Sequence, residues 1–103
     1  MCGELTDVAS GGDIDGILRA LANERRREIL ECLREAAAAG DAPLTITRLA
    51  QRTGMDRFAT SRHLAILRRA GLVSALRRRE RFEHSLNGVA LEELEEWLLR
   101  FLV

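Results

Sequence analysis

The stretch that decides the fold is residues 45–71, which read TITRLAQRTGMDRFATSRHLAILRRAG. Its apolar residues recur at the spacing of two short amphipathic helices that are separated at Gly54. Glycine has no Cβ and therefore adopts the left-handed backbone conformation that ends many helices. We predict a first helix that begins near Thr45 or Thr47 and ends at Gly54, followed by a tight turn.

The second helix of this stretch is predicted to begin after Asp56, whose short carboxylate side chain suits an N-cap. Thr60, Leu64 and Leu67 are spaced as i, i+4 and i+7, which indicates the buried stripe of this helix. Gly71 is expected to end it. The two helices together have the pattern of a helix-turn-helix.

The exposed side of the second helix carries side chains that suit contact with DNA. Its first two turns present cations, a hydroxyl group and apolar groups, which contact phosphates, base edges and thymine methyl groups. The residues expected to face bases or nearby phosphates are Arg57, Phe58, Ala59, Ser61 and Arg62. The residues expected to hold backbone phosphates are Thr45, Thr47, Arg48 and Arg52.

A hydrophobic hairpin is predicted after the helix-turn-helix, with strands over residues 72–76 and 81–86 and a turn over residues 77–80. In the second strand Phe82, His84 and Leu86 alternate with polar residues, which predicts one half-buried and one wet face. A helix-turn-helix followed by a basic hairpin is the pattern of a winged helix, whose wing touches the flanking backbone or the minor groove. The wing residues expected to contact DNA are Arg77, Arg78, Arg79 and Arg81.

Three blocks of the chain resemble the corresponding segments of ArsR-type winged-helix transcriptional repressors. They read LRALANERRREIL (18–30), TSRHLAILRRAGLV (60–73) and LNGVALEELEEWL (86–98). The resemblance covers roughly residues 14–102. It implies a homodimer whose first and last helices form the interface, and repression that an effector relieves.

Two positions depart from the pattern of that family. Asn23-Glu24 stands where such proteins often have Asp-Pro before the second helix, and Thr60 stands where an apolar residue is usual. The metal motifs of the family are also missing, because residues 44–48 contain no cysteine and no histidine occurs after His84. We therefore predict no metal ligands and no cofactor.

The rest of the chain is predicted from periodicity and caps. Residues 1–12 end in Ser-Gly-Gly and are expected to form a flexible tail, so the winged-helix domain is assigned to residues 13–103. One helix is expected from residue 13 or 14, another after the cap Asn23, and a last one over residues 89–102 after the cap Asn87. The predicted fold is mainly α, with about five helices and a small β-hairpin.

The last helix carries more apolar side chains than one side of a 103-residue domain needs. Each large apolar side chain contributes about 1.5–3 kcal/mol when it is buried, so an exposed stripe would be costly. Packing on the chain's own core accounts for part of the stripe, and pairing with the first helix and a second copy would cover the remainder. The predicted dimer interface comprises Ile14, Ile17, Leu18, Leu21, Leu91, Leu94, Trp97, Leu98, Phe101 and Leu102.

The distribution of charge favours DNA binding although the formal net charge is zero. Residues 48–81 contain ten arginines and only two acidic residues, so this part carries +8 and the remainder −8. Such a separation places a positive field on the helix-turn-helix and the wing.

The two cysteines, Cys2 and Cys32, leave a thiol-responsive alternative open. Their spacing matches no zinc pattern, and a disulfide is not the default in a cytoplasmic protein. Cys32 is expected to be a small core residue. A Cys2–Cys32 pair across subunits would instead make a thiol- or metal-responsive repressor.

No enzymatic site is predicted. Ser61 and His63 lie two positions apart on a helix, so their side chains point to different sides and cannot share a hydrogen bond. The sequence offers no paired nucleophile and base, carboxylate dyad or phosphate loop. No signal peptide is expected, because the first residues lack a basic start, and no apolar run reaches ~18 residues, so a cytoplasmic location is expected.

The leading hypothesis is a homodimeric repressor that binds an inverted-repeat operator in double-stranded DNA and responds to an unidentified effector. The alternative from another class is a winged-helix protein-interaction module without specific DNA binding. Retention on duplex DNA as salt is raised would separate the two, because specific operator binding outlasts weak non-specific binding.

Overall fold

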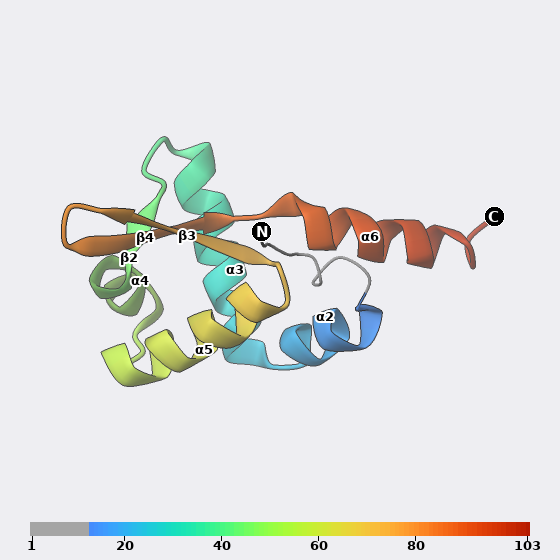
Figure 1. The fold of residues 1–103 in the computed structure, drawn as a ribbon, viewed down its shortest axis with the longest axis horizontal. Helices are drawn as coiled ribbons and strands as arrows, with labels where there is room; N and C mark the ends of the chain where they lie inside the picture. The colour runs from blue at the N-terminus through green and yellow to red at the C-terminus, as the bar shows by residue number, and fades with distance from the viewer. Residues whose placement is uncertain (1–12) are drawn as a thin grey trace, which may run out of the picture.

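A computed structural model describes residues 13–103 as five helices and one three-stranded antiparallel sheet (Figure 1). The predicted fold class, a mainly α winged helix-turn-helix, is confirmed. The predicted tail over residues 1–12 lies outside the described residues. The elements in chain order are α2 (Ile14–Leu21), α3 (Glu24–Ala38), β2 (Leu44–Thr45), α4 (Ile46–Thr53), α5 (Arg57–Arg69), β3 (Val73–Arg78), β4 (Arg81–Leu86) and α6 (Gly88–Leu99).

Each of these helices begins after a residue whose side chain accepts a hydrogen bond from a backbone N–H of the first turn. Such caps satisfy N–H groups that have no partner within the helix. The caps are Asp13, Asn23, Thr45, Asp56 and Asn87. The helix starts expected from the sequence are therefore confirmed, except that α6 begins at Gly88 and not at residue 89.

The end of α6 differs from its prediction. The helix stops at Leu99, and Arg100 is its C-cap, whereas the sequence predicted helix through Leu102. Beyond the cap, the N–H of Phe101 donates to the carbonyl of Leu98 over 3.0 Å, which is the tighter spacing of a turn. The last apolar side chains of the chain thus continue from the helix on a tighter turn.

The wing is longer and its turn is shorter than predicted. Arg77 pairs with Phe82 and Arg78 with Arg81, so the ladder reaches the tip of the hairpin and the turn has two residues instead of four. Arg79, the first of them, has a φ of 57°, which lets the chain reverse within two residues. The extra pairs satisfy backbone groups that a longer loop would leave to water.

A short third strand, β2, was not predicted. Leu44 pairs with His84 and Thr45 with Glu83, so β4 is the central strand of the sheet. Two residues are too few to show a strand period in a sequence. Thr45 is also the cap of α4, where its hydroxyl accepts a hydrogen bond from the N–H of Arg48 over 3.2 Å.

The helices close over an apolar core that contains the predicted stripe of α5. Leu64 and Leu67 are fully buried, and the buried hydroxyl of Thr60 donates to the carbonyl of Asp56 over 2.8 Å. The stripe is therefore confirmed, and an internal hydrogen bond explains why a hydroxyl is accepted where an apolar residue is usual. The other large side chains with almost no exposed surface are Ile17, Ile29, Leu33, Leu49, Leu72, Val73 and His84.

Three consecutive arginines at the start of α3 bind the ends of two other helices. The Nε of Arg26 donates to the carbonyl of Ala20 over 2.7 Å, and its Nη2 donates to that of Arg19 over 3.1 Å. Arg27 donates to a further carbonyl at the end of α2, and Arg25 to the last carbonyl of α4. Carbonyls in the last turn of a helix have no N–H one turn further on, although that of Arg19 also accepts a hydrogen bond from the N–H of the cap residue Ala22 over 3.3 Å. The guanidinium groups therefore stabilise both helix ends.

Candidate nucleic-acid interface

The start of α5, the start of α4 and the tip of the wing lie together at one end of the molecule, and α2 and α6 lie at the other (Figure 1). At the first end, Gly54 adopts a φ of 77° and Met55 is buried, which fixes the turn between α4 and α5. Asp56 then caps α5 by accepting a hydrogen bond from the N–H of Ala59 over 2.8 Å. The turn and the cap together orient the first two turns of α5.

We call the outward side of these two turns the reading face. It consists of Arg57, Phe58, Ala59, Ser61 and Arg62. All of these side chains are exposed except that of Ala59, which is half-buried. Among the described residues, Arg57 and Arg62 have no acidic partner within ion-pair distance. Their guanidinium groups are thus open to phosphates or base edges.

A groove runs between α4 and the wing. The first residues of α4 border this groove, so the positive end of the helix dipole lies beside it and favours a negatively charged group. Three arginines of different elements add positive charge around it. The lining residues are Thr45, Ile46, Thr47, Arg48, Arg57, Glu80, Arg81 and Phe82. A phosphate group of a nucleic-acid backbone has the size and charge that such a groove suits.

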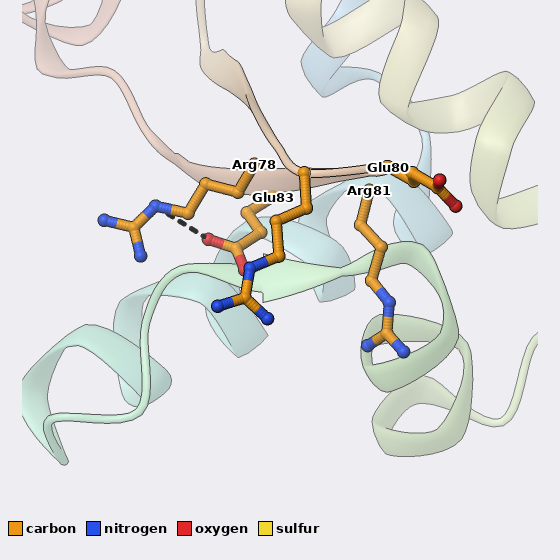
Figure 2. A pocket seen from close by; sticks show the side chains of 5 residues that line it. Arg78, Glu80, Arg81 and Glu83 are labelled. Atoms are coloured by element: carbon orange, nitrogen blue, oxygen red, sulfur yellow. Dashed lines mark ion pairs between the residues drawn. The ribbon is translucent and has the colours of Figure 1, made fainter.

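The arginines of the wing differ in their surroundings (Figure 2). The Nε of Arg78 lies 3.7 Å from Oε1 of Glu83, and the guanidinium of Arg77 lies 6.0 Å from the ring centre of Phe82. Figure 2 shows Arg81 extending from the hairpin apart from the Arg78–Glu83 pair. The side chain of Arg78 keeps 66% of its surface exposed and that of Glu83 23%, so the guanidinium is open to solvent on one side while it contacts the carboxylate.

Phe82 is more exposed than the alternation of the strand predicts. It keeps 53% of its surface accessible, whereas His84, two positions along the same face, keeps 1%. The face is therefore buried at the base of the hairpin and open at its tip, because the tip extends past the core (Figure 1). The ring of Phe82 packs near the guanidinium of Arg77.

The structure does not place Arg52 with the other residues predicted to hold phosphates. Its Nη2 lies 3.1 Å from Oδ2 of Asp41 in an ion pair. Arg52 lines a separate hollow together with Cys32 and three glutamates of α3. The acidic surroundings make this hollow a poor place for a phosphate.

Cys32 is buried in the core, as predicted for it. Burial raises the pKa of its thiol above the usual range, and the nearby Arg52 opposes this only in part. A raised pKa lowers the fraction of reactive thiolate. Cys2 lies outside the described residues, so the alternative of a Cys2–Cys32 pair across subunits is not tested by the structure. Within residues 13–103 no group of three or more metal-ligating side chains gathers.

His63 touches the arginine run, a contact that the sequence analysis missed. Its Nδ1 lies 3.5 Å from Nη1 of Arg26. Burial lowers the pKa of His63, and the positive charges of Arg26, Arg62 and Arg25 lower it further. The run of three arginines was the only available signal, and a charge run by itself does not say which helices it will meet.

The opposite end of the molecule presents an apolar surface on α2 and α6. Phe101 and Leu102 keep 68% and 76% of their surface exposed, and the ring of Trp97 packs edge-on against Phe101 at 4.9 Å between centres. Leu18, Leu91 and Leu98 of the predicted interface are also exposed. Val89 and Leu99 are exposed as well, and the sequence analysis missed them.

Four residues of the predicted interface contribute to the core of the single chain. Ile17 has no exposed surface left for a partner, and Ile14, Leu21 and Leu94 are partly buried against the core. One part of the predicted apolar stripe therefore packs in the core of the single chain, and the other part stays exposed, as the width of the stripe suggested. We call the exposed part, formed by Leu18, Leu91, Leu98, Phe101 and Leu102, the α2–α6 surface. No helix of the described chain is long and apolar enough to cross a membrane.

Comparison of the sequence with known families finds that residues 23–75 match the model "Bacterial regulatory protein, arsR family". The transcriptional repressor SdpR of Bacillus subtilis (strain 168) is 28% identical over 89 residues, which cover 86% of this chain and 92% of that protein. The transcriptional activator HlyU of Vibrio cholerae serotype O1 is 34% identical over 84 residues, which cover 82% of this chain and 72% of that protein. Both alignments extend well beyond the helix-turn-helix.

Comparison of the fold gives a consistent result. A solution NMR structure of the homodimeric winged helix-turn-helix DNA-binding domain of Mb0332 from Mycobacterium bovis matches with a TM-score of 0.66 at 28% identity. The match covers 84% of this chain and 77% of that one. Mb0332 is described as a possible ArsR-family transcriptional regulator. The sequence and the fold therefore lead to the same group of proteins.

Proposed function

Because the chain belongs to the arsR family of bacterial regulatory proteins, we propose that it is a transcription regulator that binds double-stranded DNA as a homodimer. The observation that carries this proposal is the gathering of the reading face, the start of α4 and the wing arginines at one end of the molecule. These are the three parts with which a winged helix meets a duplex.

In this proposal α5 enters the major groove and the wing lies on the flanking backbone or in the minor groove. The reading face contacts bases, and the groove between α4 and the wing holds a phosphate through Arg48, Thr47 and Arg81. The separate position of Arg52, paired with Asp41, leaves it outside this contact. Phosphate contacts set the position of the protein on DNA, and the base contacts select the sequence.

The α2–α6 surface meets the same surface of a second copy. Large apolar side chains gain about 1.5–3 kcal/mol each on burial, which favours covering this surface. A two-fold axis then places two copies of α5 about 34–36 Å apart, in successive turns of the major groove. The operator is accordingly an inverted repeat. The homodimeric state of Mb0332 supports this arrangement by analogy.

We further propose that the dimer represses transcription in the cytoplasm. In this proposal an effector releases the dimer from DNA, and the protein holds no metal ion. The relative SdpR is a transcriptional repressor, whereas HlyU is an activator. Expression of a reporter gene placed behind the selected operator distinguishes repression from activation. Higher expression on deletion of the regulator supports repression, and lower expression overturns it.

Selection of bound duplexes from a random pool tests the proposed function. The expected result is an inverted repeat that outcompetes random DNA and whose affinity falls steeply as salt is raised. The variant Arg34→Ala is the control for the loss of one positive charge outside the proposed interface, since this exposed arginine of α3 pairs only with Glu31 in the described structure. Weak binding without sequence preference would overturn the proposal and favour the protein-interaction module.

A further inference from the structure

Phe58 is the one large apolar side chain of the reading face. It keeps 80% of its surface exposed, although it follows the cap Asp56 by only two positions on a well-formed helix. The start of α5 lies at the end of the molecule away from α2 and α6 (Figure 1). The second copy in the proposed dimer therefore does not cover this ring.

The neighbours of Phe58 show which way the ring faces. Ser61 and Arg62 lie three and four positions further along the helix, so they share one side of it with Phe58. A hydroxyl, a guanidinium and a phenyl ring thus face the same short stretch of DNA in the proposed complex. The two polar groups can bond to base edges, and the ring needs an apolar surface.

The major groove offers one such surface at each A·T pair. Its edges are hydrogen-bond donors and acceptors, except for the C5-methyl group of thymine. Resting on the proposed function, we infer that Phe58 selects the operator by packing its ring against a thymine methyl group in each half-site. The rest of the reading face then supplies the polar contacts around this position.

Insertion of the ring between base pairs is the other use of an exposed aromatic side chain on DNA. Wedges of that kind work from the minor groove, where they unstack a base step and bend the duplex. The reading face belongs to a helix, whose width suits the major groove. Phe82, the other exposed phenylalanine of the DNA-facing end, lies against Arg77 in the wing and is the natural control.

Replacement of thymine by deoxyuridine in the selected duplex tests the inference, because it removes the methyl group and keeps every hydrogen-bonding group. Each thymine is replaced in turn, together with its symmetry mate. At one pair of positions the replacement should lower the affinity about fourfold per methyl group, which is the factor that corresponds to exposing one methyl-sized apolar group. Replacement of both symmetry mates should then lower the affinity roughly 15-fold. All other positions should change little.

Variants of the two phenylalanines assign the effect. Phe58→Ala should bind the thymine and deoxyuridine duplexes equally, and Phe58→Leu should keep part of the preference. Phe82→Ala should keep the parent's ratio of affinities for the thymine and deoxyuridine duplexes, even if it binds both more weakly. Because both rings are exposed, these variants should keep the thermal stability of the parent chain, which circular dichroism checks.

The outcomes distinguish this inference from the proposed function. If the parent chain binds an inverted repeat but treats thymine and deoxyuridine alike everywhere, the role of Phe58 is overturned and the proposed function stands. The same holds if Phe58→Ala keeps the methyl preference. If the selection yields no preferred duplex, the proposed function is overturned and this inference with it.

Discussion

The guanidinium of Arg26 lies 3.5 Å from Nδ1 of His63, while the Nε of the same side chain donates to the carbonyl of Ala20 over 2.7 Å. One residue of α3 therefore touches α2, on the side of the proposed dimer contact, and α5, which carries the reading face. A neutral His63 can accept a hydrogen bond from Arg26 at this distance. A protonated His63 would place two cations side by side.

The free energy of unfolding should decrease as the pH falls below 6.5, the ordinary pKa of histidine. Burial lowers the pKa of both His63 and His84 in the folded chain, so the unfolded chain binds more protons in that range. The stability is fully present above the ordinary pKa and is lost as the pH falls through the lowered ones. Urea unfolding at about pH 7.5 and about pH 5.5 measures the difference, since most carboxylates stay ionised over this range.

The variant His63→Gln serves as the control for that experiment. It should reduce the loss of stability between the two pH values, because one of the two histidines no longer titrates. A parent chain with equal unfolding free energies at both pH values would contradict the assignment of neutral histidines.

Replacement of Arg26 by glutamine should lower the free energy of unfolding by about 1–3 kcal/mol. The change removes the guanidinium donor of the Ala20 carbonyl and one of the donors of the Arg19 carbonyl, which keeps its hydrogen bond from the N–H of Ala22. Arg34→Gln is the matched control, because Arg34 is exposed and within residues 13–103 pairs only with Glu31, and it should stay within about 0.5 kcal/mol of the parent. Equal effects of the two changes would show that Arg26 does not stabilise the end of α2.

Arg79→Gly should separate the stability of the wing from its binding to DNA. Arg79 has a φ of 57° at the first position of a two-residue turn, where glycine is preferred, so stability should stay level or rise by up to about 1 kcal/mol. The lost cation should flatten the slope of log affinity against log salt by about one unit if it meets a phosphate. An unchanged slope would place Arg79 away from the DNA.

Arg62→Ala should weaken operator binding by about 1–3 kcal/mol and relax the preference at particular base pairs. Arg62 is exposed and lies on the reading face beside Ser61. Binding of the selected operator and of single-base variants measures both effects. A uniform loss on all sequences would assign Arg62 to a phosphate instead of a base.

Leu98→Glu should convert the proposed dimer to a folded monomer. Leu98 keeps 45% of its surface exposed in the single chain, so a charge there disturbs the α2–α6 surface more than the core. Light scattering after size exclusion gives the mass, and circular dichroism gives the fold. Leu76→Glu on the wing, where Leu76 is also exposed, should leave the mass of the dimer unchanged. A monomeric parent chain would refute the proposed assembly.

Local signals in the sequence were enough to locate the helices. Asn23, Asp56 and Asn87 cap the helices that follow them because their side-chain oxygens reach N–H groups within three positions. The stripe of α5 was equally local, since Leu64 and Leu67 repeat at the period of a helix. Contacts between residues that are close in sequence can therefore be predicted from the sequence.

Contacts between distant segments were not predictable in the same way. The pairing of Leu44 with His84 joins residues far apart in the chain, and a two-residue strand has no period of its own. The ion pair between Arg52 and Asp41 likewise depends on how α4 meets the end of α3. The residue types were visible in both cases, but their partners are set by tertiary packing.

The strand β2 has a mechanical consequence for regulation. Thr45 pairs with Glu83 of the wing and is also the cap of α4, so no flexible connection lies between the wing and the helix-turn-helix. We expect the two DNA-facing parts to keep a fixed spacing within each subunit. A signal that weakens DNA binding would then rotate one whole subunit relative to the other as a rigid body. The distance between the wing and α5 within each subunit would stay the same.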